Sequence, residues 1–145
     1  MKIQALAYRD IRAHGEQTYP QESCGVLLGR LTTHGWDVLD TIRATNVCLD
    51  ESVRRYQIST EELVNIQHRA RNAHLEIAGF YHSHPDHPAT WSPTDYEEAH
   101  WLGCLYMITS IEKRKTAATN CYLLLGNREE NKRFEVETIQ VEEQQ

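Results

Sequence analysis

Residues 79–95 read GFYHSHPDHPATWSPTD. Five side chains that can bind a metal ion lie within fourteen residues of this stretch, namely His82, His84, Asp86, His87 and Asp95. A polar loop that is rich in histidine could produce such a cluster, and so could a metal site. Two spacings compete for the second interpretation, one that ends at Asp95 and one that ends at His87.

The first spacing places three ligands on two predicted elements. The apolar run 77–81 predicts a strand that leads directly into His82. Successive side chains of a strand point to opposite faces, so His82 and His84 project the same way and can bind one ion together. Ser92 is a typical N-cap, and Asp95 then falls in the first turn of the following helix. Two imidazoles and one carboxylate leave one position open, as in catalytic zinc sites.

The alternative without a metal site is that both histidines lie on a surface loop and that Ser92 and Asp95 only cap a helix. The second spacing, H-x-H-x-D-H with Asp86 and His87 as ligands, is the pattern of the metallo-beta-lactamase-like hydrolases. That fold packs two sheet layers in a longer chain and needs further ligands downstream. Only 58 residues follow His87 here, and His100 is their sole histidine. Chain length and ligand count both argue against it.

The whole chain narrows the functional classes. Its 145 residues are enough for one domain with a hydrophobic core, expected to span residues 1–145 with a charged tail at about 142–145. A formal net charge of −6 argues against general binding to nucleic acid or to an anionic membrane. The first residues, MKIQALAYRDIRAHG, lack the apolar run of a secretion signal or a membrane anchor, so a cytoplasmic location is expected.

The remaining cysteines and histidines are assigned structural or surface positions. The four cysteines are far apart in the sequence and include no C-x-x-C pair: Cys24, Cys48, Cys104 and Cys121. This spacing favours reduced and mostly buried thiols over a disulfide frame or a structural zinc site. A surface position is expected for the other histidines, His14, His34, His68, His74 and His100.

Periodicity and turn residues predict a mixed α/β architecture. A first helix is expected over about residues 4–18, because Tyr19-Pro20 disfavours its continuation. A second follows Ser59, whose spacing to Glu62 predicts a capping box, and a third begins after Ser92. Helices alternate with strands early and strands dominate late, which favours a mixed sheet covered by helices. The expected strands are residues 24–29, 36–47, 77–81, 105–111, 121–126 and 133–141.

The sequence H-S-H-P followed by Ser92 and Asp95 resembles the JAMM motif of the JAB1/MPN metallopeptidase family. That family also has a glutamate near the start of its first core strand, and Glu22 stands in this position in YPQESCGVLLG. The resemblance continues through RYQISTEELVNIQHRARNAHLEIAGFYHSHPDHPATWSPTDYEEA and covers nearly the whole chain, least clearly the last twenty residues. It implies an α/β fold with a mixed, curved β-sheet flanked by helices, similar to cytidine deaminases.

The resemblance also implies roles for individual residues. His82, His84 and Asp95 would hold one Zn²⁺ per chain, which lowers the pKa of a bound water from about 15.7 toward about 7. Glu22 would take the proton of that water and pass it to the departing amine. Ser92 would donate its hydroxyl to the oxyanion, although the same hydroxyl could serve only as the N-cap.

The implied reaction is hydrolysis of a peptide or isopeptide bond after the Gly-Gly tail of a ubiquitin-like protein. The compact chain is similar to stand-alone bacterial peptidases that remove cysteine from a sulfur-carrier protein of ubiquitin fold. Two other functions stay open, hydrolysis of a small-molecule amide and a scaffold role for an MPN domain without catalysis. An extended tail would lie between two polar loops, residues 46–57 and 85–91, with Trp91 either as a wall of the groove or as a core residue.

Overall fold

The computed structural model describes residues 1–48 and 55–143. The polar segments at 49–54 and the last two residues, which belong to the predicted loop and the predicted tail, lie outside the described part of the chain. The elements follow one another in this order: β1 (Lys2–Gln4), α1 (Ala5–Thr18), β2 (Cys24–Thr32), β3 (Gly35–Ala44), α2 (Thr60–Asn72), β4 (Glu76–Pro85), α3 (Pro93–Glu98), β5 (Leu105–Glu112), β6 (Lys115–Leu125), the 3-10 turn η1 (Glu129–Asn131), β7 (Arg133–Glu137) and β8 (Gln140–Glu142).

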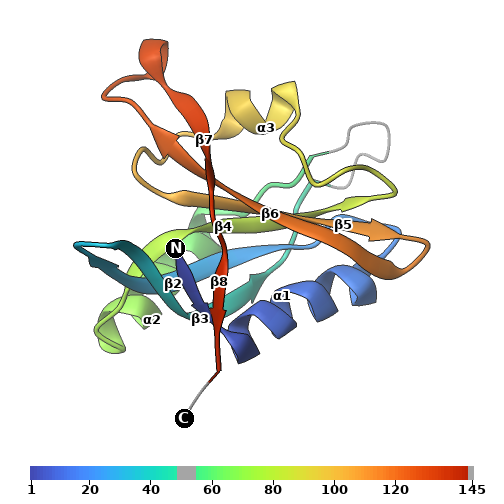
Figure 1. Ribbon diagram of the computed structural model, residues 1–145, viewed down its shortest axis with the longest axis horizontal. Helices are drawn as coiled ribbons and strands as arrows, with labels where there is room; N and C mark the ends of the chain where they lie inside the picture. The colour runs from blue at the N-terminus through green and yellow to red at the C-terminus, as the bar shows by residue number, and fades with distance from the viewer. Residues whose placement is uncertain (49–54, 144–145) are drawn as a thin grey trace.

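The strands form one mixed sheet in the order β7-β6-β5-β4-β2-β3-β1-β8. The pairs β4–β5, β1–β3 and β1–β8 are parallel, and the others are antiparallel. The two edge strands, β7 and β8, are consecutive in the chain and separated only by Thr138 and Ile139. Because so short a link joins opposite edges, the sheet must curl until its edges approach each other, as Figure 1 shows. The predicted mixed, curved sheet flanked by helices is confirmed.

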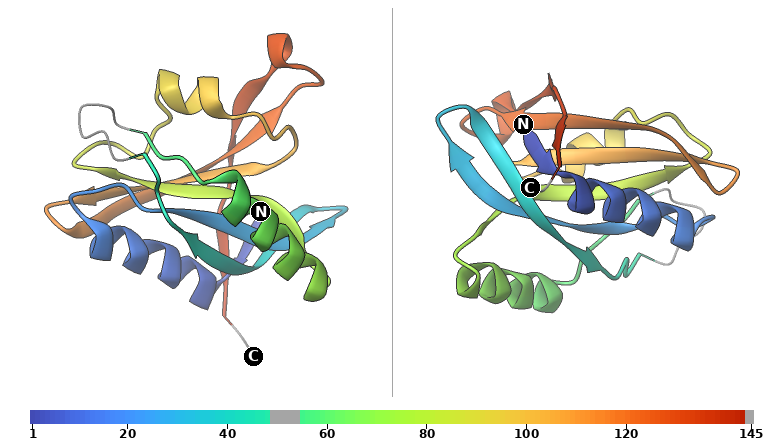
Figure 2. Two further views of the ribbon diagram at one scale, coloured as in Figure 1. Left: turned by 180° about the vertical axis from the view of Figure 1, so that it is seen from behind. Right: turned by 60° about the horizontal axis from the view of Figure 1, so that its bottom comes forward.

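Helices cover different faces of the curled sheet (Figure 2). Helix α1 turns Ala7 and Ile11 into a cluster that includes Leu27 and Met107 from the strands. Helix α2 packs the other face, where its buried Ile66 joins a second cluster with strand residues and with the segment after α3. The central strands β2, β4 and β5 are therefore buried on both sides, which explains their nearly continuous apolar runs.

The N-terminus helps to hold the edges of the sheet together. The buried ammonium group of Met1 donates to the Glu137 carboxylate and to the Thr138 carbonyl, both at 2.9 Å. Lys2 forms an ion pair with Glu142 at 3.6 Å. These contacts join β1 to the link between β7 and β8, so the closure involves both ends of the described chain.

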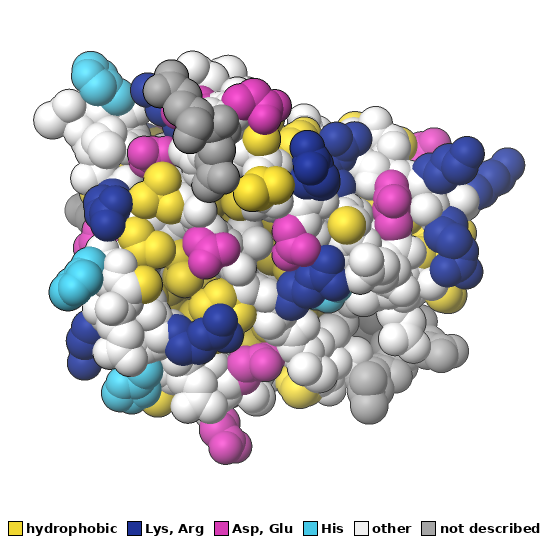
Figure 3. Space-filling view, turned by 90° about the horizontal axis from the view of Figure 1, so that it is seen from below, with side chains coloured by type: hydrophobic (Ala, Val, Ile, Leu, Met, Phe, Trp, Pro, Cys, Tyr) yellow, Lys and Arg dark blue, Asp and Glu magenta, His cyan; other side chains and the backbone are white. Residues whose placement is uncertain are grey.

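Charged side chains are interspersed on the surface. Figure 3 shows basic and acidic groups alternating on the face seen from below, rather than a single basic patch. Asp10 and Arg43 form one such pair at 2.7 Å. None of the helices within residues 1–48 and 55–143 has the length and apolarity needed to cross a membrane.

Several sequence predictions need correction at the level of single elements. The C-terminal strand predicted over 133–141 is two strands, β7 and β8, on opposite edges of the sheet. Glu142 belongs to β8 and not to a free tail. The predicted capping box of α2 is half formed, because Ser59 accepts from the Glu62 amide while the Glu62 carboxylate accepts from the Thr45 amide. The helices predicted over 4–18 and after Ser92 are confirmed.

Candidate active site

Strand β4 presents His82 and His84 on one face of the sheet. Phe80 lies on the same face, where it packs in the cluster that contains α2. Tyr81 points the opposite way, toward α1, and its hydroxyl lies 2.7 Å from Nδ1 of His14. The alternation of a strand therefore brings the two imidazoles together, and their Nε2 atoms are 3.0 Å apart.

The start of α3 supplies the carboxylate. Ser92 Oγ accepts from the Asp95 amide at 3.1 Å, and Asp95 Oδ2 accepts from the Ser92 amide at 2.9 Å. This reciprocal capping box fixes the Asp95 side chain at the N-terminus of the helix. From there, Asp95 Oδ1 lies 3.1 Å from Nε2 of His82, and Oδ2 lies 3.1 Å from Nε2 of His84. The cap and the predicted ligand are thus one arrangement rather than alternatives.

The loop after β4 sets the tautomer of His84. Its Nδ1 lies 2.8 Å from the carbonyl oxygen of Pro88. A carbonyl can only accept, so Nδ1 carries the proton and donates. In the neutral ring, Nε2 then keeps a lone pair directed at the centre of the cluster, as a metal ligand requires.

Glu22 reaches the same place through the register of the sheet. In the antiparallel pair β2–β4, Cys24 lies opposite His82. Beyond the start of β2, the Ser23 amide donates to Ser83 Oγ at 2.8 Å, and the Ser83 amide donates to the Ser23 carbonyl at 3.2 Å. The carboxylate of Glu22 consequently lies near both histidines, with the three ligand atoms within 4.8 Å of one another.

The electrostatics of the cluster favour a positive charge at its centre. Burial would raise the pKa of Asp95, but without a metal ion the Nε2–H groups of His82 and His84 can donate to its carboxylate, which outweighs burial and holds that pKa far below its ordinary value. Burial would lower the pKa of His84, but its bonds to Asp95 and Pro88 raise it instead. Two imidazole nitrogens and a carboxylate at mutual distances of about 3 Å are also the donor types that zinc binds. The residues present therefore fit a divalent metal.

Asp86 and His87 point elsewhere, which disfavours the competing H-x-H-x-D-H spacing. Asp86 Oδ2 accepts from the Tyr19 hydroxyl at 2.6 Å, and Oδ1 accepts from the Lys113 amide at 3.0 Å. His87 is exposed. Among the described residues, the ligand atoms that lie close together belong to Glu22, His82 and His84, with Asp95 at 3.1 Å from both histidines, and this group does not include Asp86 or His87.

Among the described residues, the cysteines and the other histidines are not members of the candidate metal group, although Cys24 pairs with His82 across β2 and β4. Burial raises the pKa of Cys24 to about 12 and that of Cys104 to about 11, so both thiols are unreactive. The expectation of reduced, mostly buried thiols is confirmed, since Cys121 is also buried and all four cysteines are free. The expected surface position of His14 is wrong, because this residue is only 8% exposed. Exposure is confirmed for His34, His68, His74 and His100.

Aromatic residues surround the candidate ligands. The ring of Tyr56 stacks on His82 with centroids 4.5 Å apart. Trp91 is 43% exposed and its ring lies 5.7 Å from Tyr96, so it forms the rim of the site rather than a buried core position. A small pocket beside the ligands is lined by Tyr56, His82, Trp91, Asp95, Glu98, Tyr106, Ile108 and Phe134.

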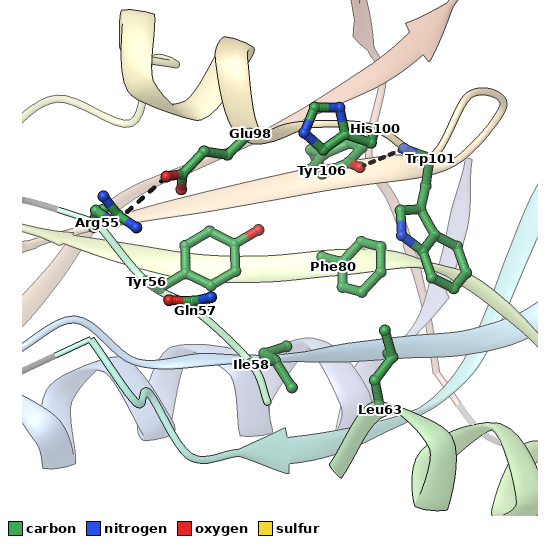
Figure 4. A pocket seen from close by; sticks show the side chains of 10 residues that line it. All are labelled: Arg55, Tyr56, Gln57, Ile58, Leu63, Phe80, Glu98, His100, Trp101 and Tyr106. Atoms are coloured by element: carbon green, nitrogen blue, oxygen red, sulfur yellow. Dashed lines mark hydrogen bonds and ion pairs between the residues drawn. The ribbon is translucent and has the colours of Figure 1, made fainter. Parts of the chain in front are cut away.

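A second pocket of about 300 Å³ lies directly beyond Tyr56 (Figure 4). Arg55 and Glu98 form an ion pair of 3.4 Å at one end, and Trp101 lies at the other. The two pockets share Tyr56, Glu98 and Tyr106. The apolar part of the lining consists of Ile58, Leu63, Phe80 and Trp101.

Sequence reasoning did not identify Tyr56. It follows the undescribed segment and precedes α2 in a stretch without helical or strand periodicity. Its position beside His82 depends on how the connection between β3 and α2 folds back. The ends of this connection are joined by Asn46 Oδ1, which accepts from the amides of Cys48 and Gln57. No local sequence signal marks that contact.

Sequence comparison relates the chain to known proteins. The family model for prokaryotic homologs of the JAB domain matches residues 4–125. A desampylase from Haloferax volcanii is 38% identical over 98 residues, which are 68% of this chain and 68% of that protein.

Comparison with solved structures also finds similar proteins over nearly the whole chain. A solution structure of a protein from Salinibacter ruber is 36% identical, with a TM-score of 0.74 over 98% of this chain and 92% of that one. A protein from Desulfitobacterium hafniense is 25% identical, with a TM-score of 0.82 over 99% and 94% of the two chains. A JAB1/MPN domain protein from Archaeoglobus fulgidus shares the fold at 17% identity, with a TM-score of 0.59 over 97% and 95%.

Proposed function

The chain belongs to the prokaryotic JAB family, and from this membership we propose that it is a zinc-dependent peptidase or isopeptidase that cleaves after the Gly-Gly tail of a ubiquitin-like protein. The observation that carries the proposal is the convergence of His82, His84 and Asp95, with each histidine Nε2 3.1 Å from the carboxylate. One zinc ion per chain would be held by these three side chains.

Zinc bound there would supply a Lewis acid that polarises a carbonyl and lowers the pKa of a coordinated water toward about 7. The capping box holds Asp95 in place, and the bond from His84 Nδ1 to Pro88 holds that imidazole in the tautomer that presents Nε2. The protein thus fixes the orientation of its ligands before any ion binds, which limits the reorganisation needed on binding.

Glu22 is the proposed general base and acid. Its carboxylate lies close to both histidines but is carried by a different segment, before β2. A carboxylate in this position can accept the proton of the attacking water and deliver it to the leaving nitrogen. It is therefore expected to act on protons and not to be needed for metal retention.

Ser92 can combine its two predicted roles. The cap uses a lone pair of Ser92 Oγ, which accepts from the Asp95 amide. The hydroxyl hydrogen then remains able to donate to an oxyanion that forms at the scissile carbonyl. One side chain would thereby position a ligand and stabilise the developing charge.

The aromatic lining supports a narrow entrance for an extended peptide tail. Tyr56 and Trp91 border the ligands, and glycine residues pass such a constriction because they have no side chain. On the N-terminal side of the scissile bond, the two glycines come first, so the first side chain of the substrate belongs to the third residue from that bond. The pocket of about 300 Å³ beyond Tyr56 is at the small end of ligand pockets and would take one apolar side chain.

A scaffold role is disfavoured because the ligand set is complete and the relative at 38% identity is named as an enzyme. The substrate would be a ubiquitin-like protein, and a sulfur-carrier protein that ends in Gly-Gly followed by cysteine is the proposed form. The test incubates zinc-loaded protein with such a carrier and determines product masses. Loss of the terminal cysteine, abolished by a chelator, is expected. An intact carrier would contradict the proposal and favour a small-molecule amide as substrate.

A further inference from the structure

We propose that Tyr19 and Asp86 are positioning residues, whose mutual hydrogen bond holds Glu22 beside the metal ligands. This inference rests on the proposed function of Glu22. Tyr19 lies three residues before Glu22, and Asp86 lies two residues after His84. The bond from the Tyr19 hydroxyl to Asp86 Oδ2, 2.6 Å long, therefore joins the segment that carries the base to the segment that carries a ligand.

Glu22 stands in the connection between two elements, and its carbonyl accepts from Asn46 Nδ2 at 3.5 Å. Helix α1 ends at Thr18 and β2 begins at Cys24, so Glu22 lies in an irregular connection outside both ladders of backbone bonds. On its C-terminal side, the connection is fixed by the buried bond from the Ser23 amide to Ser83 Oγ. On its N-terminal side, the side chain of Tyr19 makes the corresponding attachment to the loop after β4.

Asp86, which accepts the hydrogen bond from Tyr19, is itself held in place by backbone contacts. Its backbone has φ of 56°, a left-handed conformation that aspartate tolerates better than most residues. Its amide donates to the Ile111 carbonyl at 2.7 Å, and its Oδ1 accepts from the Lys113 amide at 3.0 Å. The loop after β4 is thereby fixed to β5 and to the turn that follows it, which makes Asp86 a firm point of attachment.

Tyr19 is held on a second side as well. The guanidinium of Arg114 lies over its ring, 5.5 Å from the centroid. The hydrogen bond to Asp86 also raises the pKa of Tyr19, so its hydroxyl keeps the proton that it donates. Arg114 and Lys113 lie in the turn between β5 and β6, so three connections meet at this point. These are the connection from α1 to β2, the loop after β4 and the turn from β5 to β6.

The test combines two substitutions in a double-mutant cycle. Tyr19→Phe removes the donor and keeps the ring under Arg114. Asp86→Gly removes the acceptor, and glycine adopts a φ of 56° without strain. If the two residues act through their bond, Tyr19→Phe should lower kcat roughly 10- to 100-fold, as for a displaced catalytic group, and should cause no further loss when added to Asp86→Gly. Asp86→Gly alone should lose at least as much, because it also removes the acceptor of the Lys113 amide. KM and zinc affinity should stay unchanged, because the ligands are intact.

Two further variants separate positioning from general stability. Asp86→Asn keeps one acceptor oxygen, which can serve either the Tyr19 hydroxyl or the Lys113 amide, so its kcat should lie between that of Asp86→Gly and that of the unaltered protein. Tyr8→Phe is the matched control, because Arg12 lies over the Tyr8 ring at 5.3 Å in the same manner but far from this bond along α1. Its kcat should equal that of the unaltered protein.

Hydrogen exchange supplies a readout that does not depend on activity. Amides of residues 21–23 should exchange faster in Tyr19→Phe and Asp86→Gly than in the unaltered protein, whereas amides in the centre of β4 should not. Unchanged exchange with unchanged kcat, or losses that add in the double variant, would overturn the positioning role. An inactive but zinc-loaded unaltered protein would instead contradict the proposed function, and the exchange measurement would still decide whether the bond restrains this segment.

Discussion

The ring of Tyr56 is stacked on the imidazole of His82, with centroids 4.5 Å apart and an angle of 24° between the planes. The same tyrosine lines both the small pocket at the ligands and the larger pocket of Figure 4. Tyr56 therefore has two roles in this account. It would limit the rotation of His82, a proposed metal ligand, and it lies between the proposed site of hydrolysis and the pocket proposed for the first substrate side chain.

Replacing Tyr56 by leucine should weaken substrate binding while zinc is retained. The stacking contact and the wall between the pockets are lost, but His82, His84 and Asp95 remain. We expect KM for a Gly-Gly tail to rise about tenfold, the effect of losing roughly 1.4 kcal/mol of contact energy from an aromatic pair and its buried area. Tyr56→Phe keeps the ring and should behave almost normally. Steady-state kinetics and metal analysis of both variants would show whether the ring is needed.

The larger pocket predicts selectivity at the third residue from the scissile bond. Leu63→Trp would fill the apolar end of the pocket, and it should raise KM for tails with leucine at that residue much more than for tails with alanine. Val64→Trp is the matched control, because Val64 follows Leu63 directly within α2 but is 43% exposed. Equal effects of the two variants on both tails would place the substrate side chain elsewhere.

Glu22→Gln should leave the fold and the zinc content intact and reduce turnover by a factor on the order of 10² to 10⁴, the usual contribution of a positioned acid-base group. Glutamine has almost the same size but cannot accept the proton. The comparison needs turnover and zinc content from a single preparation. Near-normal turnover would remove the acid-base role from Glu22, whereas loss of zinc would instead make it a ligand.

The buried position of His14 leads us to expect that the fold loses stability in mild acid. Burial lowers the pKa of His14 below the ordinary 6.5, with a smaller contribution from the charge of Arg43. The unfolded chain therefore binds a proton at a higher pH than the folded one, so stability is complete above about 6.5 and falls as the pH drops toward the folded pKa. His14→Gln can still bond to Tyr81 but does not titrate in this range. Denaturant unfolding from about pH 7 to about pH 5 should destabilise the unaltered protein more than this variant. Parallel losses in the two proteins would contradict the assignment.

Local sequence rules predicted those parts of the site that depend on local geometry. The alternation of a strand placed His82 and His84 together, and the capping spacing placed Asp95 at the start of a helix. Glu22 could be assigned only through resemblance to a family, because its approach depends on the pairing of β2 with β4, which are more than fifty residues apart at Cys24 and His82. Tyr56 and His14 were missed or misplaced for the same reason, since their partners are distant in the sequence.

The fold shows the same division. The long helices and central strands follow from periodicity and caps. The split between β7 and β8 did not, because RFEVETIQV reads as one continuous strand, whereas the closing of the curled sheet sends its two halves to opposite edges. The three-residue strand β1 is too short to carry a periodic signal, and it exists because β3 and β8 pair with it.

The central claim is that His82, His84 and Asp95 form one zinc site, and zinc content per chain tests it most directly. Purified protein, saturated with zinc and then freed of excess metal, should retain one zinc ion per chain. His84→Ala should retain far less, because it removes one of three ligands and the partner of both Asp95 Oδ2 and Pro88. Val64→Ala, at an exposed position of α2, should bind as the unaltered protein does. Full zinc content in His84→Ala, or no zinc in the unaltered protein, would contradict the account.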